Sequence, residues 1–182
     1  MSLTPVAAET LRRLLATAVA VPVTPYQADG NPDWDTYGTL INRLIDNGIS
    51  VITPNGNTGE FYALSQPEAR QALETAAKAA SAGGEHGAEV LAGVGHDIAT
   101  AIEAARHALR ANDFPEAMHR WEAARRFEEL RLADGSADNV SVVKEALAQL
   151  GLCRADVRPP GRPLPPDLKA EVAAILQAWD LT

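Results

Sequence analysis

The stretch Ile49–Glu60, with the sequence ISVITPNGNTGE, decides the fold of this chain. Its first five residues form a mostly apolar run of strand length, and Pro54–Gly59 that follows is rich in turn-forming residues. Similar apolar runs lie on either side, at 17–23 and 89–94, and each also ends in a turn. The sequence therefore predicts three strands that each lead into a tight loop.

Helical patterns separate these strands. Residues 34–46 carry apolar side chains at helical spacing, with Asp33 as the expected N-cap. Ser65 and Glu68 form a capping box for a second helix, and the Ala-rich stretch 98–108 predicts a third. The order β-α-β-α-β-α implies parallel strands joined by right-handed crossovers, with helices covering an apolar sheet.

The pattern changes after residue 108, and no further strand is predicted. Asp167 is the expected N-cap of the last helix, behind a stiff Pro-rich connector at 158–166. The predicted helices of this part are 114–132, 140–150 and 168–179. We therefore expect two parts, β/α units over 1–108 and a helical segment over 109–182.

Composition excludes several classes of protein. The chain has 182 residues, of which 46% are hydrophobic and 22% charged, with a net charge of -8. An acidic chain lacks the basic cluster that nucleic acid or a polybasic membrane mode needs. One cysteine cannot form an internal disulfide, and no apolar run reaches the ~20 residues of a membrane span. The expectation is a cytoplasmic protein with neither a nucleic-acid nor a membrane partner.

Motifs at the three strand ends carry a resemblance. They read Val23-Thr-Pro-Tyr26, Gly56-Asn-Thr-Gly-Glu60 and Ala92-Gly-Val-Gly95, and the helical stretch 139–152 with its Arg-Pro-Pro connector matches as well. Together they resemble the dihydrodipicolinate synthase / N-acetylneuraminate lyase family. The resemblance implies a TIM (β/α)8 barrel that acts on pyruvate or a sugar-derived 2-keto acid through a lysine Schiff base. It further implies no metal or organic cofactor, and a homotetramer or homodimer.

The length of the chain conflicts with a complete barrel, which usually needs about 250 residues. The resemblance covers the first three β/α units and the C-terminal helices, so the barrel is incomplete in this sequence. In the family, the catalytic Tyr and the Schiff-base Lys come from the strands that have no counterpart here. The lysines of this chain, Lys78, Lys144 and Lys169, stand in no such motif. No catalytic residue is identified, and we predict that this polypeptide is not itself a competent lyase.

Alternatives to the lyase remain open. In one alternative, the chain is an internally deleted, non-catalytic relative that keeps an anion-binding loop or acts through protein contacts. The other explanation, which we favour, is that a middle stretch of a longer chain is left out of this sequence and that its two flanking parts are numbered continuously. A Cα–Cα separation well above the 3.8 Å of a trans peptide between His107 and Asn112 distinguishes the two.

The loop after the second strand holds the candidate substrate-binding residues. Backbone N–H groups around Thr58 and Gly59 suit an anion, and by the resemblance they hold the keto-acid carboxylate. The alternative is a tight turn that needs glycine for its backbone angles. Asn57 stands where the family has Thr or Ser, and an amide cannot relay a proton as a hydroxyl does. This departure favours an aldolase or dehydratase over dihydrodipicolinate synthesis, unless Asn57 serves only the turn.

Other polar residues are weaker candidates. Thr24 and Tyr26 end the first strand and are candidates for the pocket wall, or pack there without contacting substrate. By the resemblance, Glu60 is structural and accepts backbone hydrogen bonds. Cys153 is interpreted as a buried filler, and the four histidines share no metal-ligand spacing. No metal site is predicted, and the sequence specifies the 2-keto acid class without naming one substrate.

Overall fold

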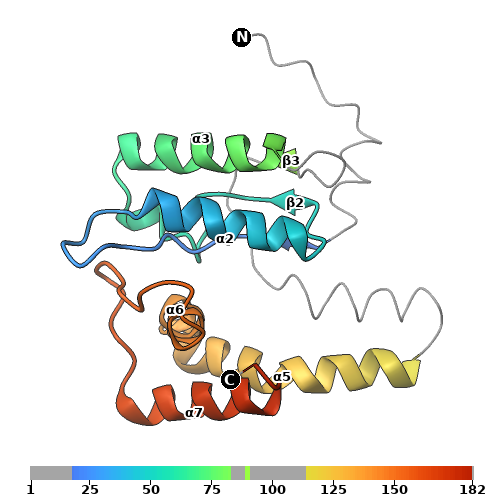
Figure 1. Ribbon diagram of the computed structural model, residues 1–182. Helices are drawn as coiled ribbons and strands as arrows, with labels where there is room; N and C mark the ends of the chain where they lie inside the picture. Colours follow the sequence, from blue (N-terminus) through green and yellow to red (C-terminus); the bar gives the residue numbers. More distant parts are fainter. Residues whose placement is uncertain (1–17, 83–88, 91–113, 182) are drawn as a thin grey trace.

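The computed structural model describes residues 18–82, 89–90 and 114–181 of the chain. The N-terminal β/α units lie above three C-terminal helices in the view of Figure 1. The described elements are β1 (Val19–Ala20), α2 (Trp34–Asp46), β2 (Val51–Ile52), η1 (Phe61–Ala63), α3 (Gln66–Ala82), β3 (Glu89–Val90), α5 (Phe114–Ser136), α6 (Asn139–Gln149) and α7 (Pro166–Ala178). The predicted alternation of strand and helix, followed by helices alone, is therefore confirmed over these ranges.

The sheet contains the three predicted strands in the order β1-β2-β3, and both pairs are parallel. Val51 of β2 is paired with Val19 of β1 and with Glu89 of β3. Both residues of β2 are completely buried, as expected for a strand between two neighbours. The hydrogen-bonded strands β1 and β2 are shorter than the apolar runs that predicted them.

The first hydrophobic core lies between the sheet and helices α2 and α3, which pack on each other. Tyr37 and Ile41 of α2 are fully buried in it, and α3 contributes small alanines. Alanine at these positions allows the two helix axes to approach closely. The members of this core are Ala18, Ala20, Tyr37, Ile41, Ile45, Ile49, Ile52, Ala72, Ala76 and Ala79.

Helix ends follow the sequence signals with one exception. Asp33 accepts a hydrogen bond from the Thr36 amide at 3.0 Å, and Ser65 and Glu68 form the capping box. The prediction that Asp167 caps the last helix is wrong, because α7 begins at Pro166 with Pro165 at the N-cap. Proline supplies a preset φ and needs no N–H partner at this position, so Asp167 falls in the first turn.

The second core joins the three C-terminal helices. Phe127 of α5 packs against Trp179 beyond α7, with ring centroids 5.5 Å apart. The expected break after α5 is present inside its bounds, because Asp134 and Gly135 have left-handed backbone angles. The buried members are Leu130, Val142, Ala146, Leu164, Val172, Ile175 and Leu176.

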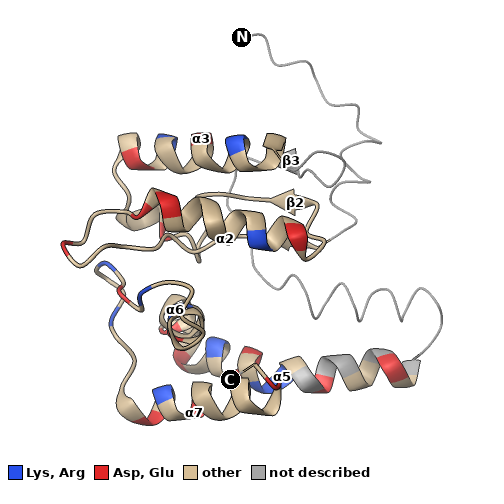
Figure 2. Ribbon diagram, in the orientation of Figure 1, with Lys and Arg blue, Asp and Glu red and all other residues tan. Residues whose placement is uncertain are grey.

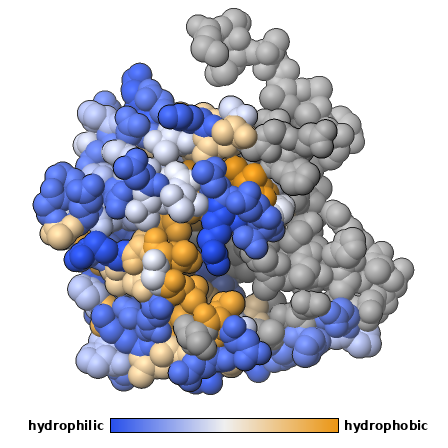
Figure 3. All heavy atoms as spheres, viewed as in Figure 1, coloured by the Kyte–Doolittle hydropathy of each residue, from blue (hydrophilic) through white to orange (hydrophobic). Residues whose placement is uncertain are grey.

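The surface charges of the described part are mixed. Figure 2 shows acidic and basic residues interspersed along the described helices. On the face viewed in Figure 3, hydrophobic residues gather toward the middle and hydrophilic ones cover the edges. Among the helices of the described ranges, none is both long and apolar enough to cross a membrane. The predicted helix 98–108, strand residues 91–94 and junction 107–112 lie outside the described residues.

Candidate functional site

The loop after β2 is held in place by a close approach of two backbones. A Cβ at Gly59 would lie 3.1 Å from the carbonyl oxygen of Pro22 and 3.3 Å from the amide nitrogen of Gly56. The left-handed backbone angles of the loop belong to Asn55 and Glu60 instead, with φ values of 60° and 57°. The alternative interpretation, in which the turn needs glycine for its backbone angles, is therefore wrong for Gly59. Glycine is required here because there is no room for a side chain.

Thr24 connects the loops that follow β1 and β2. Its hydroxyl donates a hydrogen bond of 2.8 Å to the carbonyl oxygen of Gly59, and the residue is 1% exposed. The candidate wall residue and the candidate binding loop are thus brought together, 35 positions apart in the chain. Because the hydroxyl donates to a backbone carbonyl of the loop, Thr24 helps to hold the loop in place.

Three consecutive amides of the loop have no hydrogen-bond partner within the described ranges. The N–H groups of Asn57, Thr58 and Gly59 donate no hydrogen bond to any residue within the described ranges. Thr58 and Gly59 are nonetheless buried, and Asn57 is half-buried. Buried amides are nearly always paired, so a row of free donors is a cost that a bound anion would remove. Successive backbone N–H groups in a turn form a concave site for a carboxylate or phosphate.

Glu60 is a structural anchor at the end of this loop. Its carboxylate is completely buried and forms an ion pair with Lys144 of α6. The second carboxylate oxygen accepts a hydrogen bond of 3.0 Å from the backbone N–H of Arg158. Lys144 also donates to the carbonyl oxygen of Asp156 at 2.8 Å. Burial lowers the pKa of Lys144, and the nearby Glu60 carboxylate opposes this shift.

The ring of Tyr26 contacts two cations. The Lys144 ammonium is 4.0 Å and the Arg158 guanidinium 4.7 Å from the centroid of its ring. The Tyr26 hydroxyl is buried and has no hydrogen-bond partner among the described residues. Burial, together with the Glu60 carboxylate, raises the pKa of this phenol far above its usual value. Tyr26 is 1% exposed, so it supports the site as a cation–π platform.

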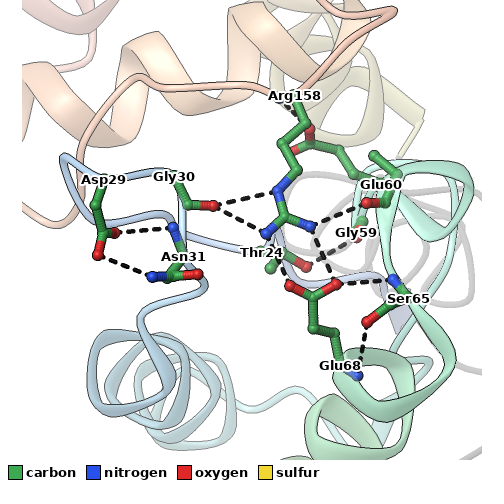
Figure 4. Close-up of polar contacts among 10 residues, drawn as sticks. Thr24, Asp29, Gly30, Asn31, Gly59, Glu60, Ser65, Glu68 and Arg158 are labelled. Atoms are coloured by element: carbon green, nitrogen blue, oxygen red, sulfur yellow. Dashed lines mark hydrogen bonds and ion pairs between the residues drawn. The ribbon is translucent and has the colours of Figure 1, made fainter.

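Arg158 was not singled out by the sequence reasoning, yet it contacts both loops. Its guanidinium lies between the Gly30 carbonyl and the Glu68 carboxylate (Figure 4). Nη2 of Arg158 donates to the Gly30 carbonyl oxygen at 2.9 Å and to a Glu68 carboxylate oxygen at 2.8 Å. The guanidinium also donates to the carbonyl oxygen of Ala63 at 3.0 Å. Its hydrogen bond lowers the pKa of Glu68 to about 2. The only signal in the sequence was the Arg-Pro-Pro connector, which gives no partner.

Two lysines and the cysteine were also considered as candidates for the chemistry of the site. Lys78 is exposed on α3, and Lys169 pairs with Glu145 at 3.2 Å. Burial raises the pKa of Cys153 to about 11, consistent with an unreactive thiol. Within the parts of the chain that the structure describes, no three His, Cys, Asp or Glu residues form a metal-binding group.

Parallel β/α units, helices over the sheet and a tight loop at the carboxyl end of a strand define a part of a β/α-barrel protein. Solved structures support this fold. Dihydrodipicolinate synthase from Bacillus clausii aligns with a TM-score of 0.72 at 22% identity, over 93% of this chain and 99% of that one. The pyruvate complex of the chloride-inhibited enzyme from Acinetobacter baumannii aligns with a TM-score of 0.71 at 14% identity, over 91% of this chain and 99% of that one.

Sequence comparison identifies the family. The family model of the dihydrodipicolinate synthetase family matches residues 14–112. A 4-hydroxy-tetrahydrodipicolinate synthase from Sulfurovum sp. is 36% identical over 54% of this chain and 32% of that protein. A probable 5-dehydro-4-deoxyglucarate dehydratase from Streptomyces coelicolor is 41% identical over 50% of this chain and 27% of that protein. The matched segment thus spans about a third of the length of these relatives. The chain belongs to the dihydrodipicolinate synthetase family.

Proposed function

We propose that the loop after β2 binds the carboxylate of a 2-keto acid, and that the chain derives from a Schiff-base lyase. The amides of Asn57, Thr58 and Gly59, which have no hydrogen-bond partner among the described residues, carry this proposal. They offer several donors to one anion, and the Thr58 hydroxyl can add another. Family membership supports pyruvate as the first ligand to test, since a solved relative is a pyruvate complex.

Asn57 bears on the reaction of the parent lyase. In a Schiff-base lyase, a lysine amine condenses with the keto carbon and releases water, and the imine then accepts electrons from the bond that breaks. A hydroxyl at position 57 would relay protons in such a site, whereas an amide only orients an oxygen. We therefore favour an aldolase or a dehydratase, and the relative from Streptomyces coelicolor carries the name of a dehydratase.

We further propose that this polypeptide binds the keto acid without forming the Schiff base. Lys144 is completely buried against Glu60, Lys169 pairs with Glu145, and Lys78 lies exposed on α3. A nucleophilic lysine needs both a free neutral amine and access to the carbonyl carbon. None of the three lysines combines these, so the second candidate function is a binding module without lyase activity.

The organisation of the chain follows from the same proposal. We expect residues 1–108 to provide the anion loop and 109–182 to support it, consistent with the separate cores of the two parts. Family membership favours a homodimer or homotetramer in the cytoplasm. Sedimentation velocity tests the assembly, and a monomer at all concentrations would contradict it.

The test combines binding and trapping. In ¹⁵N NMR titrations of the full chain, pyruvate should shift the amides of residues 57–59, whereas acetone, which lacks the carboxylate, should not. Thr58→Val should weaken binding, and the exposed Thr39→Val is the matched control. Borohydride with pyruvate should leave the mass of the chain unchanged. Absence of shifts with pyruvate would refute the binding site, and a stable pyruvate adduct would refute the non-catalytic assignment.

A further inference from the structure

The C-terminal segment reaches both strand-end loops of the candidate site. The Arg158 guanidinium contacts the loop after β1 and the segment after β2, and Lys144 contacts the end of the anion loop. These residues lie 84 to 128 positions from their partners. Contacts of that span bring parts of the chain together that the local sequence does not connect.

The Arg158 contacts use both sides of the planar guanidinium. Nε and Nη2 donate to the Gly30 carbonyl oxygen at 3.2 and 2.9 Å. Nη1 and Nη2 donate to the two carboxylate oxygens of Glu68 at 3.1 and 2.8 Å, and Nη1 also reaches Ala63. A lysine ammonium has three donors on one atom and cannot span two such separated acceptors. The guanidinium therefore fixes the distance between the loops.

The main chain of Arg158 reinforces this connection. Its N–H donates to the carboxylate of Glu60, which is the residue directly after Gly59. Glu60 has a left-handed backbone, a conformation that costs about 1–2 kcal/mol for a residue with a Cβ. The buried contacts with Arg158 and Lys144 hold Glu60 in that conformation. The shape of the loop thus depends on the C-terminal segment.

We propose that Arg158 is a positioning residue for the carboxylate site. Its side chain holds the loops after β1 and β2 at the separation at which Thr24 reaches Gly59 and the amides of residues 57–59 face one anion. This inference rests on the proposed function, because it assigns a role toward the same loop. Arg158 does not touch the ligand, since its donors are already used by Gly30, Ala63 and Glu68.

The chain supplies a matched control in the same connector. Arg162 forms a bidentate pair with Asp138 at 2.9 and 3.0 Å, within the C-terminal segment. Replacing Arg162 removes an arginine–carboxylate pair of the same kind without touching either strand-end loop. The Glu68 side chain, which Arg158→Ala leaves without its cation, is 23% exposed, so no fully buried lone charge remains. Both variants are therefore expected to fold.

Two measurements on the full-length chain test the proposal. Arg158→Ala should weaken pyruvate binding by about tenfold, the loss expected for one misplaced charge-assisted contact. Arg158→Lys should fall between wild type and Arg158→Ala, because it keeps the contact to Glu68 and loses the one to Gly30. Arg162→Ala should bind pyruvate like the wild type, and circular dichroism should show all variants folded.

Hydrogen exchange without ligand separates the positioning role from the proposed function. Arg158→Ala should speed exchange in residues 28–31 and 56–63, with α7 unchanged, and Arg162→Ala should leave both loops unchanged. If the wild type fails to bind pyruvate while these loops respond, the proposed function fails and the positioning role stands. Unchanged loop exchange and unchanged affinity in Arg158→Ala would overturn the positioning role, as would faster exchange throughout the chain.

Discussion

Replacing Lys144 by methionine should be among the most damaging single changes in the described part of the chain. The side chains of Lys144 and Glu60 are both 0% exposed, and the ammonium also donates to the carbonyl oxygen of Asp156. Methionine fills a similar volume but leaves the Glu60 carboxylate buried without its cation. Breaking a buried pair in this way costs about 3–5 kcal/mol. That is a large part of the about 5–15 kcal/mol that stabilise a typical domain.

A second variant distinguishes the ion pair from simple packing. In Glu60→Gln/Lys144→Met the buried charges are removed together, so the double variant should recover stability relative to the sum of the single changes. The coupling free energy should exceed about 1 kcal/mol, as expected for residues in direct contact. Lys169→Met is the matched control, because its pair with Glu145 is partly exposed and such pairs contribute about 0–1 kcal/mol.

Equilibrium urea unfolding at pH 7, followed by circular dichroism, provides the measurement. Free energies are compared only where the slopes agree, since a changed slope indicates a changed unfolded state or an intermediate. Equal costs for Lys144→Met and Lys169→Met would refute the reasoning. A double variant as unstable as the sum of the two single changes would show that Glu60 and Lys144 contribute independently.

Three further predictions concern other parts of the structure. Gly59→Ala should destabilise the chain by about 1–3 kcal/mol, because its Cβ would lie 3.1 Å from the Pro22 carbonyl oxygen. Gly38→Ala in α2 is the control and should stabilise the chain by about 0.5–1 kcal/mol. Urea midpoints of the two variants that move in the same direction would contradict this prediction. The pKa of Glu68 falls from 4.5 to about 2 in the folded chain, so its stabilising effect is present above pH 4.5 and is lost as the pH falls toward 2. Thermal melts from pH 7 to pH 2 should show this loss in the wild type, and Arg158→Ala should reduce it; identical profiles would argue against the pair. With a pKa of about 11, Cys153 should react slowly with a disulfide reagent at pH 8 and about tenfold faster in urea; equal rates would show an accessible thiolate.

Local signals in the sequence predicted much of the fold. Strand-length apolar runs separated by helical patterns predicted parallel strands, because parallel strands need crossovers and the helices supply them, and both strand pairs of the sheet are parallel. Asp33 and the pair Ser65 and Glu68 marked helix starts, since capping is a contact between residues three apart. Asp167 misled because a proline immediately before it begins the helix.

The candidate site was predicted only in part. The loop from Asn57 to Gly59 was identified by its motif, and its amides, which are unpaired within the described ranges, are consistent with the proposed anion site. Its connections to Lys144 and Arg158 could not be predicted, because nothing local to either residue specifies a partner more than 80 positions away. The alternative interpretation attributed the need for Gly59 to backbone angles, whereas only the position of Pro22 shows that space is the reason.

The sequence alone determined the order of the elements, the change from β/α units to helices, and the loop that we propose as an anion site. These depend on periodicity, turn chemistry and spacing along the chain, which are local properties. Only the tertiary structure decided that Glu60 is an anchor, that Tyr26 contacts two cations, and that Arg158 joins two loops. Such roles arise from burial and from pairing over long separations, where the desolvation of a charge makes its partner essential.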